Sequence, residues 1–223
     1  MNRKFISFSK KIYQCNKCTR LVNFRNKISL KKRKSYLDQV YWGKPISGFG
    51  DLNGNIIIIG LAPAAHGATR TGRVFTGDKS ADFLFNCLFK SGLSNQPNSD
   101  HINDGLKLKN TFITLALRCV PPEDKPTKEE LKNCSAFFKE ELNMIKNKKV
   151  IVALGKIAFD ACIKFYKENY GLMGSYKFGH GSKYDINGLT IFGCYHPSPR
   201  NVNTKRINTT KMTYLLKRAK KLI

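Results

Sequence analysis

A run of four isoleucines, Ile56–Ile59, with Gly60 directly behind it, most limits what this chain can fold into. The run is apolar at every position rather than at alternate positions, and β-branched residues favour strands. A strand of this kind is buried on both faces, as in parallel sheets that are covered by helices. We therefore expect residues 55–60 to form a central strand of an α/β protein.

Three later segments are as apolar as the first and predict the remaining strands of this sheet. Apolar residues recur with helical spacing between and after the strands, and Thr127 and Glu130 form a capping-box pattern at one helix start. Strands that alternate with helices predict the α/β class: a three-layer αβα sandwich around a mainly parallel, four-stranded sheet. The expected strands are Asn55–Gly60, Asn110–Leu117, Lys149–Leu154 and Thr190–Tyr195, and the expected helices are Ser80–Lys90, Thr127–Asn147, Lys156–Tyr166 and Thr209–Leu222.

The length of the chain suits one domain, because 223 residues of which 41% are hydrophobic can bury a sizeable core. No internal repeat or linker interrupts the sequence, so we expect a single domain over residues 1–223. The longest apolar run, Ile56–Leu61, is too short to span a bilayer, and the Lys-rich start Met1–Lys11 lacks the apolar core of a secretory signal. We therefore expect an intracellular protein that is neither secreted nor bound to a membrane.

Basic residues dominate the charge, with 40 Lys and Arg against 15 Asp and Glu and a net charge of +25. Such a surface attracts polyanions, of which nucleic acid is the commonest inside a cell. An AT-rich genome, which raises the Lys and Asn content, explains the same composition, so both explanations stay open. The runs Lys31–Lys34 and Lys211–Lys221 are either phosphate-binding patches or solvated faces.

The seven cysteines are odd in number and lie in a non-secreted chain, so they do not form a complete disulfide framework. Cys15 and Cys18 make a C-x-x-C pair, Cys119 follows a predicted strand and Cys134 lies in a predicted helix. Four thiolates bind either zinc or an iron–sulfur cluster. The remaining cysteines fall in apolar patterns and are expected to be buried as small hydrophobic residues: Cys87, Cys162 and Cys194.

Unusual residues fall in three loops that follow predicted strands, at the carboxyl ends where ligands bind in such sheets. These loops are Gly60–Gly67, Arg118–Lys125 and His196–Asn201. Gly60–Gly67 is rich in small residues, so its amides can approach a ligand closely, but it lacks the ending of a P-loop. In Arg70–Asp78, which comes next along the chain, one carboxylate stands among cations. Asp78 is either an N-cap or a salt-bridge partner at the start of the next helix, or a functional acid. In His196–Asn201 two prolines stiffen the loop, so that His196 could donate a hydrogen bond to a developing anion.

Seven short motifs occur in order from residue 15 to the C-terminal part of the chain. They are Cys15-x-x-Cys18-Thr-Arg-Leu-Val, Tyr41-Trp42-Gly43-Lys44-Pro45 with Gly48-Phe49-Gly50-Asp51, Gly60-Leu-Ala-Pro-Ala-Ala-His-Gly67, Arg70-Thr-Gly-Arg-Val-Phe-Thr-Gly-Asp78, Arg118-Cys-Val-Pro-Pro122, Gly179-His180-Gly181 and His196-Pro-Ser-Pro-x-Asn201. Together these motifs resemble the uracil-DNA glycosylase superfamily, and specifically its family 5 members. The resemblance covers nearly the whole chain and implies the uracil-DNA glycosylase-like fold.

The resemblance implies a monofunctional DNA glycosylase that flips uracil out of DNA and hydrolyses its N-glycosidic bond, which starts base excision repair. It implies two catalytic residues: Asp78, which stabilises the sugar cation and orients a water, and His196, which binds the uracil oxygen as negative charge develops. Phe75 is implied to stack on the flipped base. The other substrate-binding residues that it implies are Gly60, Leu61, Ala62, Pro63, Ala64, Ala65, His66 and Asn201.

The resemblance also separates the two metal alternatives, because it implies that Cys15, Cys18, Cys119 and Cys134 bind a 4Fe-4S cluster rather than zinc. We expect this cluster to be structural and to tie the N-terminal segment 1–50 to the rest of the domain. The implied partner is DNA that contains uracil or other deaminated bases. We expect a monomer that works in the cytoplasm, at a bacterial nucleoid.

Three positions carry information about the branch of the superfamily. Ala62 stands where other branches place a water-activating Asp or Asn, as expected for family 5, so the catalytic work shifts to Asp78. Leu115 stands near an Asn that in related families reads the Watson–Crick edge of uracil, which predicts activity on hypoxanthine- or xanthine-like lesions as well. Lys205 stands where the family usually shows Gly.

Other functions compete with this interpretation of the sequence. A non-catalytic, zinc-stabilised nucleic-acid-binding module would explain the charge and the cysteines, but not Asp78, His196 or the stiff loops. A glycosylase-like protein that binds abasic DNA without excising a base would use the same scaffold. A redox enzyme built on Cys15 and Cys18 is disfavoured because no thioredoxin-like helix start follows that pair.

Overall fold

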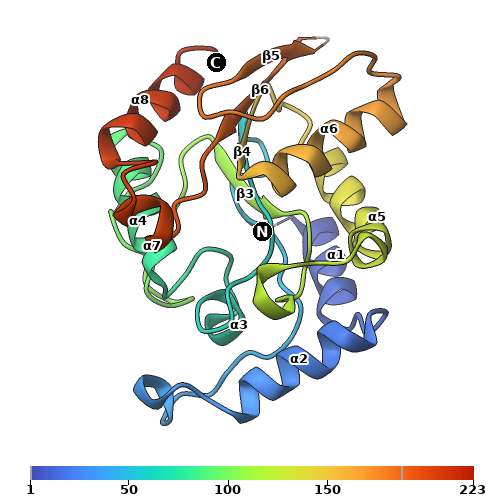
Figure 1. The fold of residues 1–223 in the computed structure, drawn as a ribbon, viewed down its shortest axis with the longest axis vertical. Helices are drawn as coiled ribbons and strands as arrows, with labels where there is room; N and C mark the ends of the chain where they lie inside the picture. Colours follow the sequence, from blue (N-terminus) through green and yellow to red (C-terminus); the bar gives the residue numbers. More distant parts are fainter. Residues whose placement is uncertain (1, 187) are drawn as a thin grey trace.

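A mixed β-sheet lies at the centre of the protein (Figure 1). The computed structural model describes residues 2–186 and 188–223, and within them the sheet has six strands. In spatial order these are β1 (Phe49–Gly50), β3 (Thr111–Leu115), β2 (Ile56–Gly60), β4 (Val150–Leu154), β6 (Leu189–Cys194) and β5 (Lys183–Ile186). The four central strands run parallel, and every residue in them is buried, as the continuous apolar runs predict.

The two outer strands, β1 and β5, pair antiparallel with their neighbours, so the predicted four-stranded sheet is too small. Both strands lack the continuous apolar pattern on which the prediction depends. β1 has only two residues, and β5 reads Lys-Tyr-Asp-Ile, in which exposed and more buried side chains alternate as in an edge strand. The four predicted parallel strands are confirmed, and so is the α/β class.

Helices cover both faces of the sheet, which confirms the three layers (Figure 1). The helices are α1 (Arg3–Tyr13), α2 (Thr19–Leu30), α3 (Ala68–Thr71), α4 (Lys79–Lys90), α5 (Lys128–Met144), α6 (Lys156–Tyr170), α7 (Pro199–Asn203) and α8 (Thr209–Lys220), with 3-10 turns η1 (Lys34–Tyr36) and η2 (Pro122–Asp124). α4 and α8 lie on one face, and α1, α5 and α6 lie on the other (Figure 1). The four helices expected from the sequence are confirmed as α4, α5, α6 and α8, and the capping box of Thr127 and Glu130 starts α5.

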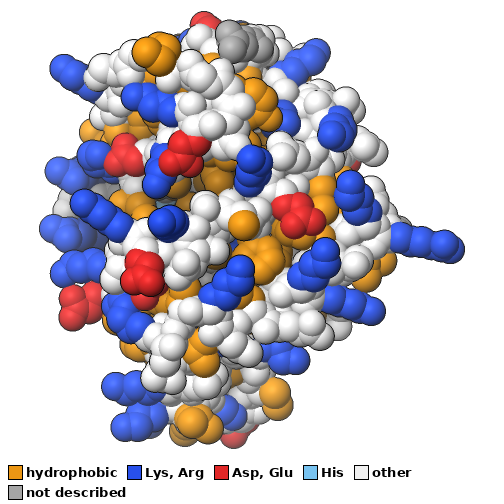
Figure 2. Space-filling model, turned by 90° about the vertical axis from the view of Figure 1, so that its right-hand side faces the viewer, with side chains coloured by type: hydrophobic (Ala, Val, Ile, Leu, Met, Phe, Trp, Pro, Cys, Tyr) orange, Lys and Arg blue, Asp and Glu red, His pale blue; other side chains and the backbone are white. Residues whose placement is uncertain are grey.

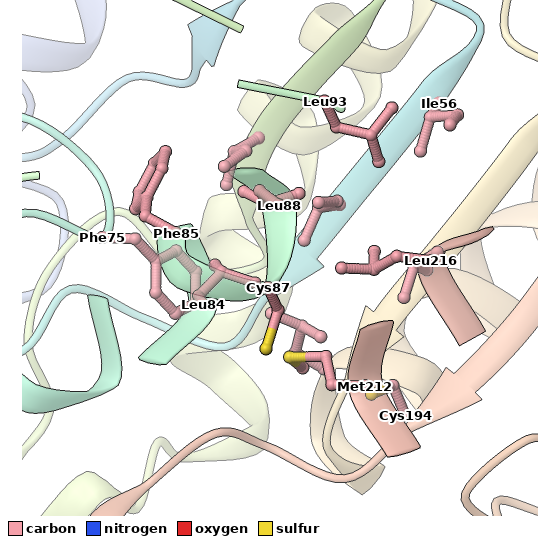
Figure 3. Packing of buried hydrophobic residues seen from close by; sticks show 14 of the residues in the cluster. Ile56, Phe75, Leu84, Phe85, Cys87, Leu88, Leu93, Cys194, Met212 and Leu216 are labelled. Carbon is pink, nitrogen blue, oxygen red and sulfur yellow. The ribbon is translucent and has the colours of Figure 1, made fainter. Parts of the chain in front are cut away.

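The isoleucines of β2 divide the core between the two faces of the sheet. Ile56 and Ile58 pack with α4 and α8 in one cluster, part of which Figure 3 shows around Leu84, Phe85 and Met212. Ile57 and Ile59 point to the opposite cluster, which includes residues of α5 and α6. Because successive side chains of a strand alternate between faces, one apolar run supplies both cores.

The sequence does not predict α1 and α2, in which apolar residues are spaced among lysines and arginines. α2 starts directly after the C-x-x-C pair, with Cys18 as its N-cap, although we expected no thioredoxin-like helix start there. α1 packs on the sheet through Phe5, whose ring meets the ring of Phe112 edge-on with 5.7 Å between centroids. α2 is tied to α5 by a salt bridge of 2.7 Å between Arg20 and Glu130. Among the described residues, no helix combines the length and the apolar character that crossing a membrane requires.

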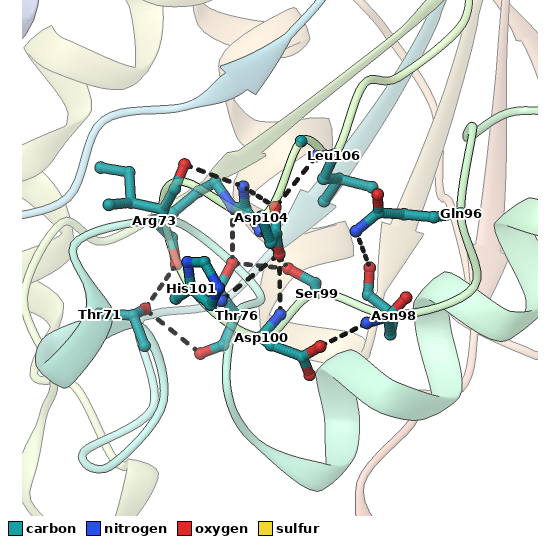
Figure 4. Close-up of polar contacts among 12 residues, drawn as sticks. Thr71, Arg73, Thr76, Gln96, Asn98, Ser99, Asp100, His101, Asp104 and Leu106 are labelled. Atoms are coloured by element: carbon teal, nitrogen blue, oxygen red, sulfur yellow. Dashed lines mark hydrogen bonds and ion pairs between the residues drawn. The ribbon is translucent and has the colours of Figure 1, made fainter.

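A buried ion pair fixes the loop that leads into α4 (Figure 4). The guanidinium of Arg73 donates to both carboxylate oxygens of Asp104, at 2.8 and 2.6 Å, and to the hydroxyls of Thr76 and Ser99. Both charged side chains are almost fully buried, with 5% and 6% exposed. Burial alone would raise the pKa of Asp104, but the hydrogen bonds from Arg73 and from the amide of Leu106 hold it well below its ordinary range.

Replacing Asp104 with Asn should lower the free energy of unfolding by about 3 kcal/mol at pH 7, because the buried guanidinium of Arg73 loses its counter-charge. Urea unfolding of the purified protein measures this difference. The exposed Asp38 provides the matched control, since Asp38→Asn should change the value by no more than about 0.5 kcal/mol. Equal stability of the two variants would contradict this role. Because the folded pKa of Asp104 is lowered, its stabilisation is present above about pH 4 and is lost as the pH falls further.

Candidate active site

A cavity of about 350 Å³ opens where the loops after β2 and β6 meet the start of α4. This is the edge of the sheet at which the parallel strands end, where ligands bind in open α/β folds. The cavity brings together residues of four separate segments, and we call it the base cavity. It is lined by Leu61, Ala62, Pro63, Ala64, Phe75, Asp78, Ser80, Asp124, His196, Ser198 and Pro199.

The ring of Phe75 forms one wall of the base cavity and packs directly against Gly60 at the end of β2. A Cβ atom on Gly60 would lie 2.8 Å from the Phe75 ring and 2.9 Å from the side chain of Leu115, so no larger residue fits there. Phe75 is only 8% exposed and has a left-handed backbone, with φ of 47°. Gly60 itself does not line the cavity. Because it has no side chain, the ring of Phe75 can pack against it and form the wall.

Asp78 caps α4 and also lines the base cavity. As the N-cap of α4, its Oδ1 accepts hydrogen bonds from the amides of Ser80 and Ala81 at 2.9 and 3.0 Å. Its other oxygen faces Gly67, where a Cβ atom would lie 1.9 Å from Oδ2. The N-cap role is confirmed, and the same side chain lines the base cavity. Burial raises the pKa of Asp78, opposed by those two amide hydrogen bonds.

His196 lines the base cavity from the loop after β6, and its ring centroid lies 6.1 Å from that of Phe75. Burial lowers the pKa of His196 to about 4, so the imidazole is neutral near pH 7 and has one N–H group to donate. In the described part of the chain, no side-chain hydrogen bond ties the ring to another residue. The side-chain amide of Asn201 donates to the His196 carbonyl at 2.8 Å, so Asn201 positions the loop rather than lining the cavity.

Two of the expected substrate-binding residues, Ala65 and His66, face a neighbouring cavity of about 620 Å³ instead. His66 shares a hydrogen bond of 2.9 Å with the hydroxyl of Tyr41. The two cavities adjoin, since three residues line both of them: Ala64, Asp78 and Asp124. We call this neighbour the second cavity.

The sequence did not single out Asp124, which lines both cavities from the 3-10 turn η2. The turn follows Cys119 in a loop already expected at the active edge of the sheet. Glu123 and Asp124 both have a left-handed backbone, with φ of 55° and 56°, which turns the chain toward the cavity. The sequence feature that could have identified Asp124 is an acidic pair directly after two prolines, a pattern that favours a turn.

Lys205, which departs from the family pattern, follows α7 and also has a left-handed backbone with φ of 55°. Glycine adopts this conformation without the steric cost that a side chain brings. The structure thus explains why Gly suits this position, and it shows the turn formed with Lys in its place.

The four cysteines of the expected metal site come together on a separate cavity beneath α2. Cys15, Cys18, Cys119 and Cys134 all line it, and none of the seven cysteines, all of which the structure describes, forms a disulfide. Among the described residues, no group of three or more His, Cys, Asp or Glu side chains is arranged so that it could hold a metal ion as it stands. Cys87, Cys162 and Cys194 are fully buried in the cores, as predicted.

Nitrogen donors contact two of the sulfur atoms of this cysteine cavity. The buried guanidinium of Arg25 donates to Cys119 Sγ at 3.3 Å, and the amide of Arg118 donates to Cys134 Sγ at 3.3 Å. Burial raises the pKa of Cys134 to about 12, so its thiolate needs a strong compensating positive charge. The donor set therefore fits a group that binds four thiolates and accepts N–H···S hydrogen bonds.

Comparison with known proteins assigns the chain to a class. Residues 47–220 match the family model described as the uracil DNA glycosylase superfamily. The chain therefore belongs to this superfamily, as its motifs and its α/β fold indicate.

Within the superfamily, the chain is more similar to curated type-5 enzymes than to a curated type-4 enzyme. The chain is 41% identical over 212 residues to the type-5 uracil-DNA glycosylase of Pyrobaculum aerophilum, covering 95% of this chain and 90% of that one. It is 39% identical over 218 residues to the type-5 uracil-DNA glycosylase of Thermus thermophilus, covering 97% of both chains. Similarity to the type-4 uracil-DNA glycosylase of Pyrobaculum aerophilum is lower, at 26% over 161 residues.

Proposed function

We propose that this protein is a monofunctional DNA glycosylase that excises uracil from DNA by hydrolysis of the N-glycosidic bond. The observation that carries the proposal is the joint placement of Phe75, Asp78 and His196 on one cavity at the carboxyl edge of the sheet. Type-5 uracil-DNA glycosylases that match over nearly the whole chain support the same activity. The product, an abasic site, is the substrate from which base excision repair continues.

The base cavity suits a base that has left the duplex. A base inside the helix is out of reach of Asp78 and His196, so the target nucleotide must flip out of the stack. The Phe75 ring provides a flat apolar surface on which a flipped base can stack, and the small residues Ala62 and Ala64 leave room beside it. The net charge of +25 favours binding to the phosphates of the DNA that carries the base.

The two polar groups of the cavity suit the charges that develop when the bond breaks. The sugar becomes positive and the uracil leaves as an anion. Asp78, fixed by its hydrogen bonds to α4, stabilises the sugar cation and orients the attacking water. The neutral His196 donates to the uracil oxygen, where a well-placed donor contributes about 3–4 kcal/mol.

The range of bases that the enzyme excises depends on the residue at position 115, which here is Leu115. This side chain is 1% exposed and packs beside Gly60 in the core, and it is not among the residues that line the cavity. No amide at position 115 therefore reads the Watson–Crick edge, and we propose that hypoxanthine or xanthine is also excised. Oligonucleotides carrying uracil, hypoxanthine or xanthine, cleaved by alkali after incubation with the enzyme, test both statements. Alkali-labile sites from uracil substrates support the activity, and rejection of both other bases would contradict the wider range.

The non-catalytic binding module fits this chain less well than the enzyme does. It gives no reason for a carboxylate and a neutral imidazole on one cavity beside an aromatic wall. A module of that kind would bind uracil-containing DNA and leave the base attached. We also propose that the enzyme is a monomer that acts on the chromosome in the cytoplasm, at the bacterial nucleoid.

We further propose that Cys15, Cys18, Cys119 and Cys134 hold a 4Fe-4S cluster. The shared cavity and the N–H groups of Arg25 and Arg118 aimed at sulfur support this assignment. The cluster would join the N-terminal segment 1–50 to the loop after β3 and to α5, within one domain over residues 1–223. Its contribution is structural, since binding free energy at such a site stabilises the fold.

Replacing Cys134 with Ala should remove the cluster and lower the thermal midpoint, because only three of the four ligands remain. Iron and acid-labile sulfide, measured on anaerobically purified protein, should fall from about four per chain to a small fraction of that value. Cys162→Ala, which also removes a buried thiol but lies in α6, is the matched control and should keep its iron. Unchanged iron in the Cys134 variant would rule out this ligand.

A further inference from the structure

A basic arm, defined here as residues 31–41, connects α2 to the segment before β1 and projects at the lower left of Figure 1. Four consecutive cations, Lys31 to Lys34, open the arm, and three of them are exposed: Lys31, Arg33 and Lys34. Lys32 donates to the carbonyl of Leu37 and closes the arm on itself. The other three make no salt bridge within the described residues, so their charges are available to a partner.

Two apolar side chains stand exposed on the same short segment. Leu37 is 58% exposed and Val40 is 92% exposed. Exposed apolar groups beside free cations suit a partner that presents both anions and apolar surface. A DNA strand does so, with its phosphates and with the faces of its sugars and bases.

Contacts fix the arm to the loops that form the cavities. The guanidinium of Arg70 lies 4.0 Å from the centroid of the Tyr36 ring and also hydrogen-bonds to the side chain of Gln39. The same guanidinium donates to the carbonyl of Gly77 at 2.7 Å, next to Asp78. The arm is therefore held in a defined position relative to the proposed active site.

The second cavity reaches from the base cavity to this arm. Arg33 and Tyr36 line it from the arm, and Asp78 and Asp124 line it where it adjoins the base cavity. Burial, followed by the charges of Arg33 and Arg70, lowers the pKa of His66, so these two cations lie close enough to act on a ring that lines the second cavity. The strand that continues from a flipped nucleotide must leave the base cavity, and the second cavity adjoins it.

We propose that the basic arm binds the DNA strand beside the flipped nucleotide, with Lys31, Arg33 and Lys34 at its phosphates and Leu37 and Val40 against its sugars and bases. This inference rests on the proposed glycosylase function. Figure 2 shows Lys and Arg side chains spread over another face of the molecule, so a charge effect must be separated from the general basicity of the protein. The test therefore needs a variant that removes equal charge elsewhere.

The test compares two triple variants with wild type. The arm variant is Lys31→Gln, Arg33→Gln and Lys34→Gln. The control is Lys109→Gln, Lys146→Gln and Lys149→Gln, which removes three exposed charges near the amino ends of β3 and β4, at the opposite edge of the sheet. Fluorescence anisotropy measures the Kd for a duplex with one tetrahydrofuran abasic analogue, at several KCl concentrations between about 50 and 200 mM.

The arm variant should bind about 10- to 100-fold more weakly at about 150 mM salt. The slope of the logarithm of its binding constant against the logarithm of the salt concentration, called the salt slope here, should be shallower by about two to three. This corresponds to about 0.9 for each phosphate that the arm no longer neutralises. The control should keep the wild-type slope. Equal slopes in the two variants would overturn the proposal, as would arm-dependent binding to anionic vesicles without any effect on DNA. If wild type releases no uracil while the arm still sets the salt slope, the glycosylase function fails and the role of the arm in DNA binding stands.

A second variant tests the apolar part of the arm. Leu37→Ser with Val40→Ser should weaken binding about tenfold without changing the salt slope, since these side chains carry no charge and bury apolar surface instead. An unchanged Kd would show that these two residues do not touch the DNA.

Discussion

Replacing Asp78 with Asn should slow uracil excision by about 10²- to 10⁴-fold while the melting temperature stays within about 2 °C of wild type. Asparagine caps a helix as well as aspartate does, so the hydrogen bonds to the amides of Ser80 and Ala81 survive. The variant lacks the negative charge that stabilises the sugar cation. Single-turnover excision from a labelled uracil oligonucleotide measures the rate, and Asp160→Asn, on the exposed surface of α6, is the matched control.

The pH dependence of the same reaction gives an independent check on Asp78. Burial raises the pKa of Asp78. The pH at which the wild-type rate falls on the acid side, which we call the acid limb, should therefore lie above the ordinary carboxyl pKa of about 4. The reaction needs the ionised form, and activity therefore falls as the pH drops through the raised pKa. The limb should be absent in the Asn variant. A rate at the control level in that variant would remove Asp78 from catalysis and leave it as an N-cap.

Replacing His196 with Ala should slow excision by about 10²- to 10³-fold, the range found when one donor to a developing anion is removed. Burial lowers the pKa of His196 and keeps the imidazole neutral near pH 7, so it donates one N–H group to the uracil oxygen without carrying a charge. The variant should bind the abasic duplex as well as wild type does, because His196 acts on the transition state.

His101→Ala is the control for this variant, since His101 is exposed and lines neither cavity. It should keep the wild-type rate. A rate for His196→Ala within about tenfold of that control would contradict the proposed role.

The sequence predicts the centre of the fold well because burial on both faces leaves a continuous apolar run, as in Ile56–Ile59. It fails at the edges, where β5 mixes Lys and Asp with Tyr and Ile and resembles a polar loop. It fails also at α1, whose buried Phe8 and Ile12 are separated by lysines on the solvent side. Helices and strands that are half exposed have a weaker hydrophobic pattern in the sequence. Whether such a segment is a helix, a strand or a loop depends on its packing in the folded protein.

For the site, the sequence and its motifs predict which loops meet, but not which side chains share a cavity. Asp78 and His196 lie 118 positions apart and line the same space because both segments reach one edge of the sheet. His66 belongs to the same loop as Ala62 yet faces the second cavity, because the chain turns between them. Asp124 depends on two successive left-handed residues, a backbone choice that composition does not reveal.

The most direct test of the proposed activity is the amount of free base released. Wild-type protein is incubated with a uracil-containing oligonucleotide, and free uracil and intact strand are quantified by mass spectrometry before any alkali treatment. We expect one free uracil for each abasic site formed, with the strand unbroken until alkali is added. Tight binding of the oligonucleotide with no free uracil would contradict a glycosylase and leave the protein as a DNA-binding module.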